Sequence, residues 1–191
     1  MPHAVPAPRK TDLPPGLRFE GHAIVSADGM IAAADGSVPE ALRNDLDWHQ
    51  FQAALDRSVL VVLGRLGHER HPNPGRRRLV FTSRVTGVAA DPADPLATLF
   101  NPAGASLAEA MALLGLTGGV VAVTGGTLVF DYFRPLYSAF SLAEAHRAVL
   151  TRGRPCFPEA HPRCALAAAG LAPDRFDVLD AAGAVTLTRW A

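Results

Sequence analysis

Several features that mark membrane, secreted or nucleic-acid-binding proteins are missing from this sequence. Hydrophobic residues make up 49% of the 191 residues, yet they form no apolar run long enough to cross a membrane. The first ten residues, MPHAVPAPRK, contain neither the apolar core nor the cleavage pattern of a secretory signal. Basic and acidic side chains number 18 each, so no overall charge favours nucleic acid or an anionic membrane. Any anion must therefore be bound by a local cluster of basic residues.

Cysteine is also scarce, and the potential metal ligands are scattered. The two cysteines, Cys156 and Cys164, are not in a metal-binding spacing. Four histidines also lack the spacing of a ligand set: His68, His71, His146 and His161. We therefore expect no metal, two reduced thiols and a cytoplasmic protein.

The length and the distribution of proline predict one domain with an N-terminal arm. A chain of 191 residues can bury a substantial core as one domain. Residues 1–18 contain five prolines, so we expect an extended arm there rather than a helix or a central strand. Residues 19–191 are expected to form the domain.

Hydrophobic periodicity predicts that strands and helices alternate along the rest of the chain. The expected strands are 17–28, 58–65, 77–84, 118–126, 136–145 and a closing hairpin at 175–190 with its turn at 181–183. The expected helices are 41–57, 105–116 and a third that starts after the glycines near 126. Ser106 and Glu109 form a capping box for the second helix. This order predicts an α/β fold, a mostly parallel central sheet with helices on both faces and a C-terminal antiparallel hairpin.

Residues capable of chemistry follow several of the predicted strands. SADGM follows the first strand, Gly64 and Arg65 follow the second, TSR ends the next, and TGG ends the strand at 118–126. In such sheets ligands bind beyond the carboxyl ends of the strands. We therefore expect these segments to line one cleft.

Two adjacent glycines, Gly125 and Gly126 in VVAVTGGTLVFDYF, leave the backbone bare where a strand gives way to a helix. Without side chains, this turn lets a ligand approach the main chain, and the amides of the first helical turn are free to bind a phosphate. A tight structural connection would use the same residues. The glycines alone leave both interpretations open.

Seven segments follow one another in an order and spacing typical of one superfamily. They are AIVSADGMIA, VPEALRNDLDWHQF, VVLGR, PGRRRLVFTSR, SLAEAMAL, VVAVTGGTLVFDYFRP and GRPCFPE. In this order the chain, from about Phe19 to its end, resembles dihydrofolate reductase and its superfamily, which includes the reductase domain of the riboflavin pathway. The resemblance implies a dihydrofolate reductase-like fold and hydride transfer from NADPH to a C=N bond of a bound heterocycle.

The resemblance also implies how NADPH would be held. Gly125 and Gly126 would pass under the pyrophosphate, and the positions that hold the adenosine phosphates are matched by two arginines and a serine. An arginine fork suits a phosphate dianion better than a ribose hydroxyl, which favours NADPH over NADH. The implied cofactor residues are Gly64, Arg65, Ser83, Arg84, Gly125, Gly126, Thr127 and Phe130.

On the same basis Asp45, early in the first predicted helix, matches the one acid that faces the substrate. A carboxylate there can accept two parallel hydrogen bonds from an amino-amidine edge and raise the proton affinity of the imine nitrogen. Asp47 lies two residues on, on another face of the helix, and is expected to be solvated. Without the resemblance, Asp45 would be interpreted as an exposed acid near a helix N-terminus.

Further substrate contacts are implied by the resemblance. Arg76 matches the arginine that binds the α-carboxylate of folate's glutamate tail, with Arg77 and Arg78 as alternatives. The implied pocket residues are Ile24, Val38, Leu46, His49 and Thr124.

Three departures from the family pattern leave the substrate open. Glu40 replaces a tryptophan of the mobile loop, His49 an aromatic residue, and Ala143 a threonine that supports the acid. We expect an NADPH-dependent reductase of 7,8-dihydrofolate or a related reduced pterin, working as a monomer or homodimer. The alternatives are a riboflavin-type pyrimidine reductase, whose ribose phosphate would recruit the arginines at 76–78, and a nucleotide-binding homologue without catalysis.

Overall fold

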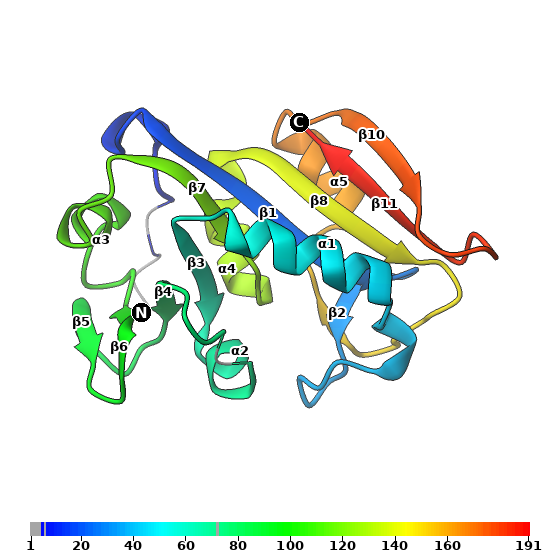
Figure 1. The fold of residues 1–191 in the computed structure, drawn as a ribbon, viewed down its shortest axis with the longest axis horizontal. Helices are drawn as coiled ribbons and strands as arrows, with labels where there is room; N and C mark the ends of the chain where they lie inside the picture. The colour runs from blue at the N-terminus through cyan, green and yellow to red at the C-terminus, as the bar shows by residue number, and fades with distance from the viewer. Residues whose placement is uncertain (1–4, 6, 72) are drawn as a thin grey trace.

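A nine-stranded sheet forms the centre of the protein (Figure 1). This computed structural model describes residues 5, 7–71 and 73–191. The strand order is β10-β11-β8-β1-β7-β3-β4-β6-β5. The strands are β1 (Gly16–Ser26), β3 (Leu60–Gly64), β4 (Arg78–Phe81), β5 (Val88–Asp91), β6 (Asp94–Phe100), β7 (Gly118–Val123), β8 (Tyr137–Ala145), β10 (Pro173–Val178) and β11 (Val185–Trp190). A separate antiparallel pair joins β2 (Met30–Ala32) to β9 (Arg154–Pro155).

The strands in the middle of the sheet are parallel, and antiparallel strands lie at both ends. β1 is parallel to β7 and β8, β3 is parallel to β7 and β4, and β4 is parallel to β6. The β10–β11 hairpin pairs antiparallel with β8 at one end, and β5 pairs antiparallel with β6 at the other. The predicted α/β fold, with its mostly parallel sheet and C-terminal hairpin, is confirmed.

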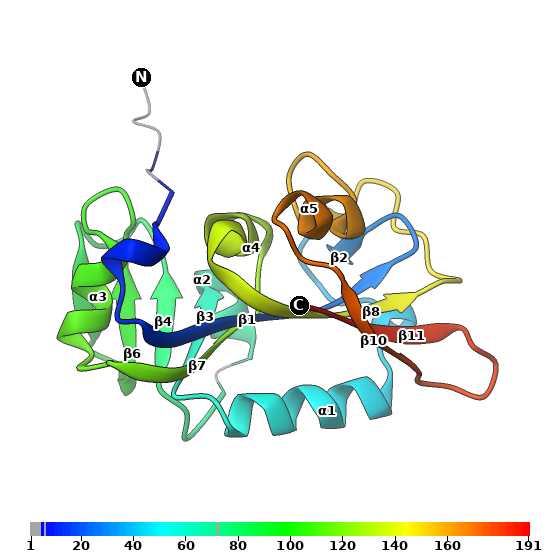
Figure 2. The same cartoon turned by 90° about the horizontal axis from the view of Figure 1, so that it is seen from above.

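Helices cover both faces of the sheet (Figure 2). α1 (Asp45–Asp56) lies along one face, whereas α4 (Thr127–Phe133) and α5 (Pro162–Ala168) lie on the opposite face. The remaining helical segments are α2 (Arg65–Arg70), α3 (Leu107–Leu113) and the 3₁₀ turns η1 (Lys10–Asp12), η2 (Glu40–Leu42) and η3 (Arg134–Leu136). Within the part of the chain that the structure describes, no helix is long and apolar enough to cross a membrane.

Apolar side chains from these helices form the core on both faces. Phe130 of α4 contacts Phe140 of β8 and Phe157, with ring centroids 5.5 and 6.2 Å apart. On the other face, Leu55 and Phe51 of α1 pack against buried residues of β3, β4 and β7. Because removal of this apolar surface from water stabilises the centre of the sheet, the strand ends have a rigid base.

Helix α1 begins later than its periodicity predicts. The sequence predicts a helix from Ala41, whereas Glu40–Leu42 form the separate turn η2 and α1 starts at Asp45. Asn44 is the reason, because its side chain accepts a hydrogen bond from the Asp47 amide at 2.9 Å and caps the helix. This cap places Asp45 and Asp47 in the first turn of α1.

The first strand also begins earlier than the predicted end of the arm. β1 starts at Gly16, one residue before the predicted strand, and Leu17 pairs with Gly119 of β7. Leu13 and Leu17 are buried in the main core, so the last residues assigned to the arm pack against the domain.

The sequence does not predict the β5–β6 hairpin, the β2–β9 pair or α5. These elements are short, and β6 buries just Ala97 and Phe100 among its seven residues. Their apolar residues are too few to give a periodic signal.

The predicted capping box at α3 is confirmed. Ser106 Oγ accepts from the Glu109 amide at 3.2 Å, and the Glu109 carboxylate accepts from the Ser106 amide at 2.6 Å. We expect Ser106→Ala to lower the free energy of unfolding by about 1 kcal/mol, measured by urea denaturation. An unchanged midpoint would mean that other contacts hold the first turn of α3.

Candidate functional site

A cleft of ≈ 1950 Å³ passes the carboxyl ends of β3, β4 and β7 and extends along α1 to the β10–β11 hairpin. Its lining includes Ile31 beyond β1, Gly64 at the end of β3, Thr82 and Ser83 after β4, and Thr124 after β7. Parallel strands bring these residues, which are distant in sequence, to one edge of the sheet. The segments after β3, β4 and β7 therefore line one cleft, as expected, whereas no residue of SADGM, 26–30, is among its described lining residues.

The glycine turn between β7 and α4 forms one wall of this cleft. Gly125 and Gly126 are joined by a cis peptide bond. The Gly64 amide donates to the Gly125 carbonyl at 2.8 Å, and the Thr124 amide donates to the Val62 carbonyl at 2.9 Å. These two hydrogen bonds fix the turn to the end of β3.

The two glycines of this turn have different roles. Gly125 has a φ of 108°, and a Cβ added there would lie 2.9 Å from the ring of Phe130. A Cβ added to Gly126 would meet just the Ile31 side chain, at 3.9 Å. The turn itself therefore requires Gly125, whereas Gly126 leaves open space beside the first turn of α4.

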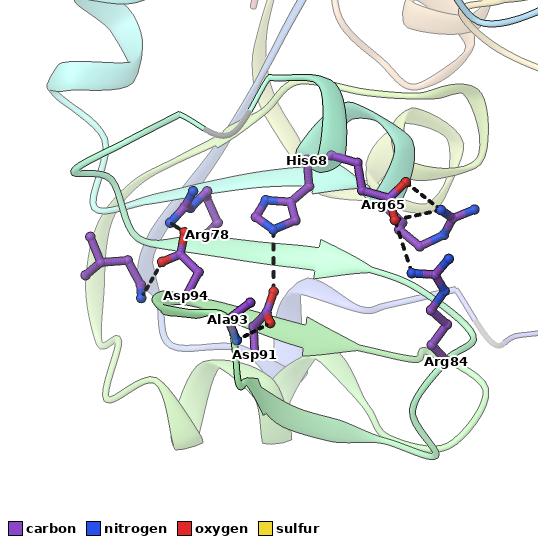
Figure 3. Close-up of polar contacts among 9 residues, drawn as sticks. Arg65, His68, Arg78, Arg84, Asp91, Ala93 and Asp94 are labelled. Atoms are coloured by element: carbon purple, nitrogen blue, oxygen red, sulfur yellow. Dashed lines mark hydrogen bonds and ion pairs between the residues drawn. The ribbon is translucent and has the colours of Figure 1, made fainter.

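Two of the arginines expected at the cofactor meet around a carboxylate (Figure 3). Arg65 Nη1, at the start of α2, donates to both carboxylate oxygens of Glu69, at 2.8 and 2.7 Å. Arg84 Nη1 donates to Glu69 Oε1 at 3.1 Å. The hydrogen bond from Arg65 lowers the pKa of the Glu69 carboxyl, and the charges of both arginines act in the same direction. Arg65 and Ser83 line the cleft, and Arg84 is held just outside that lining.

Other charged residues near α2 support the β5–β6 hairpin (Figure 3). His68 Nε2 lies 3.5 Å from Asp91 Oδ2, and the buried Arg78 donates to Asp94 Oδ2 at 2.6 Å. The backbone hydrogen bond from Leu96 lowers the pKa of the Asp94 carboxyl, and Arg78 adds to this effect. Among the residues that the structure describes, none of these side chains lines the cleft.

The three consecutive arginines do not assemble the expected clamp. Arg76 is paired with Asp56, with its Nη2 2.6 Å from the carboxylate, and Arg77 donates to the Leu114 carbonyl at 2.7 Å. Arg78 is buried in β4. The described lining of the cleft contains none of the three, because neighbouring residues that enter a strand point in different directions.

The two acids of the first turn of α1 differ in environment. Asp45 is exposed, whereas Asp47 is half-buried on the side of Phe51, one turn further along the helix. Burial raises the pKa of the Asp47 carboxyl from 3.8 to about 6. Both residues line the cleft. Asp47 is thus not solvated as expected, because it lies one turn before Phe51, on the side of α1 that packs against the sheet.

His22 of β1 lies on the same face of the sheet as α1. Its ring packs edge-on against Phe51 with centroids 6.1 Å apart. Burial lowers the pKa of His22 to about 4, and the charges of Arg189 and Arg57 add to the effect. His22 is therefore neutral near pH 7 and lines the cleft as a polar, uncharged group.

The raised pKa of the half-buried Asp47 leads us to expect that the stability of the protein depends on pH. The folded state binds more protons than the unfolded state between about pH 4 and 6, so the contribution of Asp47 to stability falls as pH rises through this window. Asp47→Asn should therefore raise the free energy of unfolding relative to wild type at pH 7, by at most about 3 kcal/mol, and change it little at pH 4. Urea denaturation of both proteins at the two pH values tests this. If the free energies of unfolding of the two proteins differed by the same amount at pH 4 and pH 7, the Asp47 carboxyl would be solvated.

The structure separates the other predicted site residues into two groups. The predicted residues that line the cleft are Ile24, Val38, Asp45, Gly64, Arg65, Ser83, Thr124, Gly125, Gly126, Thr127 and Phe130. Leu46, His49, Arg76 and Arg84 are not among its described lining residues. Thr124 Oγ1 donates back to the Val62 carbonyl at 3.2 Å, and the Thr127 hydroxyl donates to the Pro155 carbonyl, so both hydroxyls are held by the backbone.

Two further arginines of the cleft, Arg70 and Arg154, could not be predicted as site residues. Arg70, at the end of α2, donates to the carbonyls of Gly36 and Asp35, and Arg154 Nε donates to the Ala34 carbonyl at 3.2 Å. The two guanidinium groups flank Gly36, because a Cβ there would lie 2.9 Å from an atom of each. They hold the loop 33–37 against α2 and β9, and this long-range contact has no local sequence pattern.

Potential metal ligands are not grouped in the described part of the chain. Within residues 5, 7–71 and 73–191, no cluster of three His, Cys, Asp or Glu side chains could hold a metal ion. Cys156 is buried and Cys164 is exposed, and neither forms a disulfide.

Comparison with known proteins gives matches in structure. No protein-family model and no curated protein matches the sequence. A protein of Shewanella sp. PV-4 whose name assigns it to riboflavin biosynthesis aligns with a TM-score of 0.66 and 18% identity, over 91% of this chain and 97% of the other. Dihydrofolate reductase from Enterococcus faecalis, in complex with NADP(H) and RAB-propyl, aligns with a TM-score of 0.63 and 20% identity, over 91% and 95%.

Proposed function

We propose that this chain, which has the dihydrofolate reductase-like fold, is an NADPH-dependent reductase of a C=N bond in a pterin, with 7,8-dihydrofolate or a related reduced pterin as substrate. One observation carries the proposal. The same cleft has an open glycine turn beside Arg65 at the end of β3, and a half-buried acid on α1. The first arrangement suits a dinucleotide phosphate, and the second suits a protonatable heterocycle.

The residues around the glycine turn fit the cofactor that the proposal requires. A pyrophosphate could approach the main chain at Gly126, where the cleft is open, and reach the amides of the first turn of α4. Arg65 and Ser83 line the cleft nearby and could bind a 2′-phosphate. NADPH bound there would supply the hydride.

Asp47 would assist transfer of the proton that accompanies the hydride. A carboxyl with a pKa of about 6 is present in both protonation states near neutrality, which suits proton transfer. As a carboxylate, it could accept two hydrogen bonds from the amino-amidine edge of a pterin and favour protonation of the imine nitrogen. Hydride then adds to the imine carbon, the proton adds to nitrogen, and the C=N bond becomes a single bond. Asp45, exposed on the same turn, is the sequence-based alternative for this role.

A pyrimidine reductase that acts on a ribose-phosphate substrate is the second candidate. Arg70 and Arg154 line the cleft as two neighbouring cations. Arg154 uses Nε for its loop contact, and within the described residues its terminal amino groups make no hydrogen bond, although its charge also acts on the Asp35 carboxyl. Such a pair suits a phosphate monoester better than the neutral edge of a pterin.

Parallel turnover assays test the proposal and separate the candidates. NADPH oxidation is followed by absorbance with dihydrofolate and with a phosphoribosyl-aminopyrimidine, and cofactor binding is followed by fluorescence. We expect turnover of dihydrofolate. Turnover of the pyrimidine alone would select the second candidate, whereas NADPH binding without turnover of either would favour a non-catalytic binding protein.

A further inference from the structure

We infer that Glu69 is an internal competitor of the cofactor's 2′-phosphate and limits the preference of this protein for NADPH over NADH. The inference rests on the proposed function, because it concerns the site at which that cofactor would bind. It adds a specificity residue that neither the resemblance nor the structural comparisons assign.

The geometry places the Glu69 carboxylate where a phosphate would have to bind. Arg65 gives two hydrogen bonds of 2.8 and 2.7 Å to its oxygens, and Arg84 gives a third of 3.1 Å. Each arginine makes these contacts through Nη1, so the carboxylate occupies one amino group of each guanidinium from which a phosphate oxygen would otherwise accept. Glu69 is four residues beyond Arg65, so the helix α2 itself keeps the two side chains on one face.

The charges make this arrangement unfavourable for a phosphate dianion. Two guanidinium groups around one carboxylate leave a single net positive charge instead of two. When a 2′-phosphate binds, Glu69 either stays and repels it or leaves and loses its contacts with both arginines. Both routes weaken the binding of NADPH, and neither affects NADH, which carries a hydroxyl at that position.

Neighbouring acids do not share this role. Asp91 lies against His68, and Asp94 accepts from Arg78 and from the Leu96 amide. Glu69 is the carboxylate in ion-pair contact with both Arg65 and Arg84 among the residues that the structure describes. Its side chain is 43% exposed, so its replacement leaves the core intact.

The test compares wild type with Glu69→Gln, which keeps the size of the side chain and removes its charge. Calorimetric titration measures the Kd of NADPH and NADH, and of the fragments 2′,5′-ADP and 5′-AMP, which isolate the contribution of the phosphate. Asp174→Asn is the matched control, because Asp174 is an exposed acid on β10 at the far end of the sheet. Glu69→Ala repeats the test with no side-chain amide.

We expect Glu69→Gln to tighten NADPH and 2′,5′-ADP about tenfold, and to leave NADH and 5′-AMP within about twofold of wild type. Asp174→Asn should leave all four constants unchanged. Weaker NADPH binding in both Glu69 variants would overturn the inference, because Glu69 would then position the arginines. An unchanged NADPH to NADH ratio would also overturn it. If wild type bound neither dinucleotide, the proposed function would fail first, and the inference with it.

Discussion

Asp47→Asn should lower the rate of pterin reduction by about 100-fold, which corresponds to about 3 kcal/mol of transition-state stabilisation. The substitution keeps the shape of the side chain and removes the charge that would bind the amino-amidine edge and favour the protonated imine. The half-buried position of Asp47 and its raised pKa of about 6 are the basis of this expectation. The measurement is kcat and KM for dihydrofolate, with the Kd of NADPH determined separately.

Asp45→Asn is the matched control for this result. It removes the same charge two residues away, from an exposed position in the same first turn. We expect it to change kcat by less than about threefold, in line with the small effects of exposed charges. Loss of turnover in Asp45→Asn with little change in Asp47→Asn would restore the sequence-based assignment. Because Asp47→Asn is expected to be more stable than wild type at pH 7, a loss of activity in it cannot be ascribed to unfolding.

Gly126→Val should weaken NADPH binding by at least about 100-fold, or about 2.7 kcal/mol, while the protein stays folded. A Cβ at this position meets no backbone atom and lies 3.9 Å from Ile31, so the free protein can accommodate it. The branched side chain would instead occupy the space through which a pyrophosphate reaches the main chain. Fluorescence titration with NADPH measures the loss, and thermal unfolding checks the fold.

Gly125→Val serves as the contrasting variant. Its φ of 108° and the Phe130 ring 2.9 Å from the added Cβ make any side chain there disruptive. We therefore expect Gly125→Val to lower stability as well as binding. If Gly126→Val bound NADPH like wild type, the glycine turn would be a structural connection and the cofactor would be placed elsewhere.

Much of the fold could be predicted from the sequence, because its central strands and long helices have strong local signals. β3 is a continuous apolar run, α3 has its capping box, and the glycine turn ends β7. The β5–β6 hairpin could not be found in the same way, because its strands bury few apolar residues. Helix α5 is as long as α3, but its N-terminus carries no capping box that would identify it in the sequence.

The sequence allows prediction of the site residues that strand topology brings to the cleft. It does not allow prediction of those whose role depends on the direction of the side chain. Arg65 and the glycines follow strands, so topology alone brings them to the cleft. The choice between Asp45 and Asp47 depends on which side of α1 packs against the sheet, and Asp47 lies on the side of Phe51. The pairing of Arg76 with Asp56 depends on a contact between residues 20 positions apart, which no local pattern encodes.

Transfer of hydride to the substrate is the central claim, and an isotope experiment tests it most directly. NADPH that carries deuterium at the transferable position is incubated with the protein and dihydrofolate, and the product is examined by mass spectrometry. The account predicts one deuterium on the carbon of the former C=N bond, with loss of the label from the cofactor and about 100-fold slower transfer in Asp47→Asn. Unlabelled dihydrofolate and intact deuterated NADPH, recovered after prolonged incubation with protein that binds both, would contradict it.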